Sequence, residues 1–207
     1  MKIRLTKILC AIIVIVFALE VFNGATQLFG RGGDGEALNR MGAINPSVFS
    51  EGAYWRLLAA MFLHIGLLHL LLNTWALYQL GTLFESLFGT PRFAITYFLT
   101  GIAASIVSAI RTEGLSAGAS GAIFGILGAL IVSLWRSPRW KSQPWVKGLI
   151  QQLGVWAGIN IVIGFSVPGI DNNAHIGGFV AGLLLGLIPH RVPPPPPSAE
   201  VIEVGSH

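Results

Sequence analysis

Six apolar windows divide the chain, and short polar segments separate them. The windows cover residues 8–22, 67–87, 93–110, 119–135, 148–167 and 174–188. A helix needs about 20 apolar residues to cross a bilayer, with about 17 as the usual lower end. The first and last windows are short, but their flanks can lengthen them. The pattern predicts an all-α polytopic membrane protein with six transmembrane helices in one domain, residues 1–191. Residues 192–207 form a proline-rich tail that we expect to be disordered.

Composition supports this setting. Of 207 residues, 53% are hydrophobic and 11% are charged, whereas soluble domains carry about 25% charged residues. The first window follows a basic start and is brief, as in a secretory signal peptide. Glu20 interrupts it, however, and no clear small-residue cleavage site follows. These two features favour a retained membrane anchor, with a cleaved signal peptide as the alternative.

The basic residues predict the orientation of the helices. Cytoplasmic loops of membrane proteins favour Lys and Arg. With the N-terminus in the cytoplasm, nine of the thirteen basic residues lie in cytoplasmic segments and four on the other side. The nine are Lys2, Arg4, Lys7, Arg92, Arg136, Arg139, Lys141, Lys147 and Arg191, and the four are Arg31, Arg40, Arg56 and Arg111. Both termini are therefore predicted to be cytoplasmic. The net charge of +4 then needs no nucleic-acid partner.

The long segment 24–66 is predicted to lie on the non-cytoplasmic side. Residues 30–35 have the glycine content of a mobile loop, and residues 45–47 indicate a turn. Residues 48–63 are predicted to be amphipathic and interfacial, with Trp55 and Arg56 facing lipid headgroups.

Two residues that can carry chemistry begin apolar windows at the same predicted end. Ser120 lies between Gly118 and Gly121, and His175 opens the last window. Ionisable side chains are rare inside membranes and are functional candidates by default. Serine is a weak nucleophile until a base takes its proton, and histidine is the usual base. A helix N-terminus also leaves backbone N–H groups free to stabilise an oxyanion.

Glycine spacing predicts that these two helices pack closely. Three glycines follow His175 at helical spacing, and four glycines on the fourth window share a face beside Ser120. They are Gly178, Gly182 and Gly186, and Gly118, Gly121, Gly125 and Gly128. Small residues at this spacing allow membrane helices to pack backbone to backbone. Such packing alone is the simpler interpretation, but it also brings an imidazole within reach of a hydroxyl.

The second predicted helix and the residues just before it supply His64, His69 and Asn73. His69 and Asn73 share a helix face and could donate to an oxyanion. A metal site is the rival interpretation, but His64 lies off that face and no His-Glu-x-x-His motif is present. Buried polar residues that join helices are a third interpretation, strongest for His64. Asp171 precedes His175 by four residues, yet we expect it to be a solvated loop residue, which favours a dyad over a triad.

The motifs in their order resemble the rhomboid family of intramembrane serine proteases. They are Trp55 with Arg56, then His64, His69 and Asn73, then residues 85–89, then Gly118, Ser120 and Gly121, then Ala174, His175, Gly178 and Gly182. Each motif is weak alone, but the ordered set, from about residue 52 to 186, is highly specific.

This resemblance implies a six-helix rhomboid-like bundle with a Ser–His dyad facing the non-cytoplasmic side. It implies that Ser120 is the nucleophile and His175 the base, and that His69, Asn73 and the Ser120 N–H form the oxyanion hole. Phe124 occupies a position where many relatives carry a tyrosine packed against the histidine. The substrates would be single-span or polytopic membrane proteins within the lipid bilayer, with no cofactor, metal or nucleic acid. The fifth helix would be a flexible side wall.

Two other classes of protein remain open. A non-catalytic rhomboid-like protein would bind membrane clients without cutting them, but such proteins usually lack the serine or the histidine. A small transporter fits the predicted topology, yet it does not require a serine and a histidine in these places. Other intramembrane proteases are disfavoured because neither His-Glu-x-x-His nor paired intramembrane aspartates occur.

Overall fold

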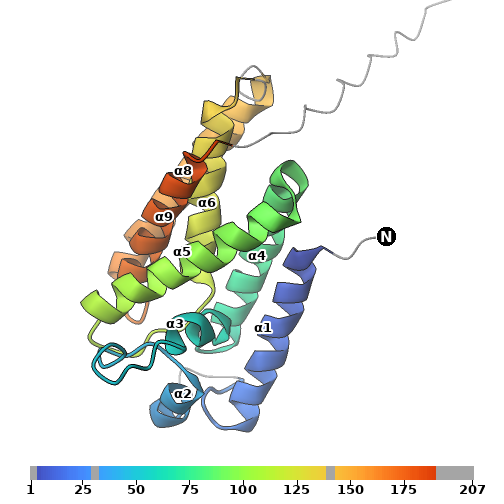
Figure 1. The fold of residues 1–207 in the computed structure, drawn as a ribbon. Helices are drawn as coiled ribbons and strands as arrows, with labels where there is room; N and C mark the ends of the chain where they lie inside the picture. The colour runs from blue at the N-terminus through green and yellow to red at the C-terminus, as the bar shows by residue number, and fades with distance from the viewer. Residues whose placement is uncertain (1–3, 29–32, 139–142, 190–207) are drawn as a thin grey trace, which may run out of the picture.

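The computed structural model describes residues 4–28, 33–138 and 143–189, and it is a bundle of helices (Figure 1). The helices are α1 (Leu5–Phe22), α2 (Gly35–Met41), α3 (Arg56–Ala59), the 3-10 helix η1 (Ala60–Phe62), α4 (Leu67–Phe88), α5 (Thr90–Arg111), α6 (Ser120–Arg136), α8 (Pro144–Ser166) and α9 (Asn172–Gly186). Within the described ranges, a single isolated bridge between Ile44 and Ser116 is the one β-type pairing. The predicted tail, residues 192–207, lies outside the described residues.

Each of the six predicted windows coincides with one of the helices α1, α4, α5, α6, α8 and α9, so the all-α prediction is confirmed. The predicted number of six membrane spans is not confirmed. Three described helices, α1, α5 and α8, are long and apolar enough to cross a membrane, and α3 to α4 forms a fourth span if that pair, bent by 95°, counts as one. With 17 residues, α6 is only about 25 Å long, shorter than the hydrocarbon layer of about 30 Å.

Helix α6 lies at the centre of the bundle, where α5 and α9 pack against it and against each other (Figure 1). Leu127 and Leu130 of α6 are fully buried, as are Phe93 and Tyr97 of α5. Helix α1 packs on the other side, against α4. The two helices that carry the candidate residues, α6 and α9, are thus the most extensively packed pair in the described structure.

The α6–α9 interface is built on glycine, as the spacing predicts. A Cβ atom added at Gly178 would clash with the carbonyl oxygen of Gly121, and one added at Gly182 would clash with that of Gly125. Without these Cβ atoms the two backbones are in direct contact. This contact fixes how the N-terminal ends of α6 and α9 lie relative to each other.

Helix α8 packs much less closely. At Gly148, Gly154 and Gly158 nothing lies within 4 Å of the position of an added Cβ. Val146 and Leu153 of its first half are buried in the core. In its second half the Trp156 ring is 5.7 Å from that of Phe124, and the Asn172 amide donates a 2.9 Å hydrogen bond to the carbonyl of Ile161.

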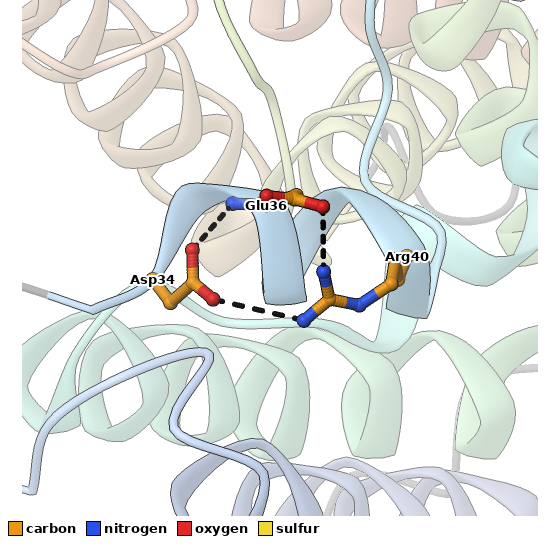
Figure 2. A network of polar contacts seen from close by, with 3 residues as sticks. All are labelled: Asp34, Glu36 and Arg40. Carbon is orange, nitrogen blue, oxygen red and sulfur yellow. Dashed lines mark hydrogen bonds and ion pairs between the residues drawn. The ribbon is translucent and has the colours of Figure 1, made fainter.

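Helix α2 caps itself at the surface. The Asp34 carboxylate accepts a 2.9 Å hydrogen bond from the N–H of Glu36, and Arg40 pairs with Glu36 at 2.8 Å and with Asp34 at 3.6 Å (Figure 2). These ion pairs are well exposed, so they contribute little stability. Their role is local, because they order a helix that the hydrophobic pattern did not predict. Part of the loop predicted at residues 30–35 lies outside the described residues, and Gly35 already belongs to α2.

The prediction for Arg56 was wrong. Its side chain is buried at 8% exposure and does not face lipid headgroups, whereas Trp55 beside it is 54% exposed. The guanidinium donates hydrogen bonds to the backbone carbonyls of Asn39 and Ala43. It therefore holds the end of α2 to the segment that leads into α4. Within the segment 48–63, which was predicted to be amphipathic and interfacial, only residues 56–62 are helical.

Candidate active site

Ser120 and His175 meet at the N-terminal ends of α6 and α9. Ser120 is the first residue of α6, and His175 lies in the first turn of α9. Nε2 of His175 lies 2.8 Å from Oγ of Ser120, within hydrogen-bond distance. His175 is 8% exposed and Ser120 is half-buried. A hydroxyl that is partly open to solvent therefore contacts an imidazole that is held inside the protein.

Phe124 fixes the plane of the imidazole. It lies one helical turn after Ser120, and its ring stacks on that of His175 with centroids 4.4 Å apart and planes 13° apart. Trp156 of α8 packs on Phe124. The stacked ring restricts rotation of the histidine, so Nε2 stays directed at the serine.

Asp171 is not the solvated loop residue that we expected. It is the N-cap of α9, where its carboxylate accepts a 3.0 Å hydrogen bond from the N–H of Ala174. Ser108 and Thr112, at the end of α5, also donate to it. The first turn of α9 is thereby fixed to α5, and His175 lies in that turn.

These contacts also set the charge of Asp171. Burial alone would raise the pKa of its carboxyl, but hydrogen bonds hold that pKa below its usual value. The donors are the hydroxyls of Ser108, Ser116 and Thr112 and the N–H of Ala174. In the described residues Nδ1 of His175 is buried without a hydrogen-bond partner, so Asp171 makes no hydrogen bond to the imidazole. Its hydrogen bonds position His175 through the backbone of α9.

The segment before α6 is held from two sides. The N–H of Gly118 donates to the carbonyl of Ala60 at 2.9 Å, and Ser116 pairs with Ile44. Gly118 has a φ of +143°, which favours glycine. Because Gly118 has no side chain, the His69 ring can lie close to its backbone, beside the serine. Nε2 of His69 is 3.0 Å from the position of an added Cβ, and Oγ of Ser120 is 3.7 Å from it.

His69 presents a hydrogen-bond donor beside Gly118. Its Nδ1 lies 3.3 Å from the backbone N of Ile65, which donates to it. A neutral imidazole that accepts through Nδ1 carries its proton on Nε2. Nε2 is the nitrogen that lies beside Gly118. His69 therefore has the tautomer that an oxyanion donor needs.

Asn73 and His64 both lie next to His69. The Asn73 amide donates a 2.9 Å hydrogen bond to the carbonyl of His69, one turn earlier on α4, and keeps a second N–H. His64 is fully buried, with its ring centroid 5.1 Å from that of His69. Its Nε2 lies 3.5 Å from the N–H of Ala119. No group of three or more potential metal ligands forms within the described ranges.

Two buried acids were not predicted as part of this arrangement. Glu20 of α1 accepts a hydrogen bond from the N–H of His64. Glu85 of α4 accepts hydrogen bonds from Thr6 and Thr90 and so ties the start of α1 to the α4–α5 turn. The available signal was a charged residue inside an apolar window. Their partners, distant in sequence or in turns, were not visible in the pattern.

The helices and the buried polar site define a multi-pass integral membrane protein. The Rhomboid domain family matches residues 51–192. This chain belongs to the rhomboid family.

Named relatives agree with this assignment. Rhomboid protease GluP of Bacillus subtilis (strain 168) is 39% identical over 170 residues, which are 82% of this chain and 31% of the relative. RHOMBOID-like protein 5 of Arabidopsis thaliana is 36% identical over 154 residues, 73% of this chain and 49% of the relative. Rhomboid-type serine protease 2 of Emericella nidulans is 34% identical over 142 residues, 68% of this chain and 28% of the relative. This chain thus spans less than half the length of these three relatives.

Proposed function

We propose that this protein is an intramembrane serine endopeptidase that cleaves transmembrane segments of single-span or polytopic membrane proteins. The observation that supports the proposal most strongly is the 2.8 Å contact between Oγ of Ser120 and Nε2 of His175. Two of the relatives above are named as proteases, which supports the same reaction class.

In the proposed reaction, Nε2 of His175 takes the proton of Ser120 as Oγ attacks the substrate carbonyl carbon. The carbonyl double bond opens and its oxygen becomes an oxyanion. The imidazolium then gives its proton to the leaving amine, and the C–N bond breaks to leave an acyl-serine. A water molecule, deprotonated by the same imidazole, hydrolyses the ester and restores Ser120.

The oxyanion has three proposed donors. They are the backbone N–H of Ser120, Nε2–H of His69 and the second amide N–H of Asn73. The first turn of a helix leaves its N–H groups without intrahelical partners and carries the positive end of the helix dipole. The position of Nε2 of His69, close to Gly118 and on the same side as Oγ of Ser120, supports this location for the oxyanion.

We further propose that six helices, α1, α4, α5, α6, α8 and α9, cross the membrane, with both termini in the cytoplasm. In Figure 1 the starts of α6 and α9 point to one side of the bundle, the side on which α2 and α3 lie. That side is proposed to be non-cytoplasmic. A site near the helix starts would be shallow, which suits a reaction that needs water.

The test is cleavage of a generic single-span substrate by the purified protein in detergent, followed on a gel. The wild-type protein is expected to cut. Ser120→Ala and His175→Ala are each expected to abolish cutting while the protein stays folded, and the double variant to be no worse, because the two residues act as one unit. A chelator is expected to leave the rate unchanged. Substrate binding without cleavage by the wild type would favour a non-catalytic, client-binding protein instead.

A further inference from the structure

Glu20 is a fully buried carboxyl group near the end of α1, and the proposed reaction does not use it. It lies in the last turn of α1, at 0% exposure. Placing an ionisable group inside a membrane protein is costly, so such groups usually have a function. The partner of this carboxyl indicates which function.

One oxygen of Glu20 accepts a 2.8 Å hydrogen bond from the backbone N–H of His64. A second hydrogen bond of this kind lies just after α1, where the hydroxyl of Thr26 accepts from the N–H of Gly66 at 2.9 Å. We call these two hydrogen bonds the clamps. Both N–H groups belong to the break between η1 and α4, where the chain turns by 95°. The start of a helix has no backbone acceptors for such groups. Helix α1 and the residues after it supply these acceptors.

The segment between η1 and α4 also contacts two groups of the candidate active site. The N–H of Ile65 donates to Nδ1 of His69, and this bond sets the tautomer of His69. Nε2 of His64 accepts a hydrogen bond from the backbone N–H of Ala119, the residue before Ser120. A shift of the backbone at residues 64–65 would therefore move one oxyanion donor and the support of the serine together.

We propose that Glu20 is a positioning residue for the active site. It holds the backbone of His64 so that His69 and the Ala119–Ser120 backbone keep their geometry during the reaction. This inference rests on the proposed function. It makes α1 part of the catalytic apparatus, although the family match begins only at residue 51.

Two substitutions separate this role from general packing. Glu20→Gln keeps an oxygen that can accept the N–H of His64, so its kcat is expected to stay within about threefold of wild type. Glu20→Met has a similar length but no acceptor. Because displacement of a donor by about 1 Å can cost a hundredfold in rate, we expect kcat to fall by about ten- to a hundredfold with KM within about twofold.

The matched control is Thr6→Val at the other end of α1. Thr6 is also fully buried and hydrogen-bonded, to Glu85, but it lies far from the break along the helix. It is expected to lower the melting temperature and to leave kcat within about twofold of wild type. Thr26→Val removes the second clamp with little change in shape, and it is expected to lower kcat in the same direction as Glu20→Met. It serves as the test if Glu20→Met does not fold.

All variants are compared by kcat, KM, melting temperature and hydrogen exchange of the peptide covering residues 60–70. Glu20→Met is expected to speed exchange in that peptide, and Thr6→Val is not. An active wild type with an equally active Glu20→Met variant overturns the inference, as does an equal fall in kcat for Thr6→Val. If the wild type does not cleave, the proposed function fails. Unchanged hydrogen exchange of residues 60–70 in Glu20→Met would separately contradict the proposal that Glu20 holds the backbone of His64.

Discussion

The α6–α9 pair and helix α8 use glycine in opposite ways. On α6 and α9, glycines bring two backbones into contact, and a Cβ at Gly178 or Gly182 would meet a carbonyl oxygen. On α8, Gly148, Gly154 and Gly158 face open space, and Gly164, near the end of the helix, is close to the Asn172 side chain. Composition alone does not separate the two cases, since all three helices are apolar and glycine-rich. The difference shows that the protein is closely packed where Ser120 and His175 meet and loosely packed beside that place.

This contrast in packing predicts a contrast in rigidity between the α6–α9 pair and α8. A two-residue site works only if the two helix ends keep their distance, and direct backbone contact provides that. A helix with few close contacts opens at low cost in free energy. The resemblance to rhomboids implies a flexible side wall at this helix, and the open glycines of α8 agree with that expectation.

The largest effect is expected from Gly178→Val, which breaks the close pair. The new side chain meets the carbonyl of Gly121, so α6 and α9 must separate near Ser120 and His175. Overpacking of this kind typically costs about 1–3 kcal/mol, and we expect cleavage to fall below detection. Melting temperature and gel cleavage measure both effects. A variant that cleaves normally would show that the contact does not hold the site.

Asn73→Ala sharpens the comparison by changing the chemistry and leaving the helix packing intact. Loss of one oxyanion donor is expected to lower kcat by roughly ten- to a thousandfold. Substrate binding is expected to change little, because the donor acts mainly in the transition state. Steady-state kinetics distinguish the two parameters. A rise in KM with kcat unchanged would place Asn73 in substrate binding instead.

Asp171→Ala loosens the start of α9 without touching the glycine contact. Loss of a helix cap costs about 0.5–2 kcal/mol, and Asp171→Asn is expected to recover much of it. Because the folded pKa of Asp171 lies below its usual value of 3.8, its contribution is present above pH 3.8 and is lost as the pH falls through the folded pKa. Melting curves at several pH values test this. Equal loss of stability in both variants at neutral pH would mean that the charge, and not the cap, is what matters.

The smallest effect is expected from Gly154→Ala on α8. Nothing lies near the new methyl group, and alanine favours helix over glycine by up to about 1 kcal/mol. We expect unchanged or slightly higher thermal stability and cleavage within about twofold of wild type. Marked destabilisation would mean that another surface covers this face of α8, and the contrast with α9 would then be lost.

The hydrophobic pattern was sufficient for the helices and for the glycine contact. Both depend on local periodicity, and the positions of Gly178 and Gly182 relative to His175 are set by helix geometry alone. The proximity of Ser120 and His175 followed from the predicted topology of the windows. Helix α2 was missed because it has seven residues and no apolar window.

The roles of the buried acids and of Arg56 could not be predicted in the same way. Each depends on backbone or side-chain groups whose positions only the folded chain determines. Arg56 donates hydrogen bonds to the carbonyls of Asn39 and Ala43. Asp171 accepts hydrogen bonds from hydroxyl groups about 60 residues earlier in the sequence. A charged residue looks solvated in a sequence until its buried partners are known.

Reaction of the purified protein with a fluorophosphonate probe tests the central claim most directly, because this probe forms a bond only with an activated serine. Mass spectrometry then identifies the labelled residue. The account predicts labelling of Ser120 in the wild type and none in His175→Ala, although that variant keeps its fold. Labelling of Ser120 that persists without His175, or an unlabelled Ser120 in the wild-type protein, would contradict it.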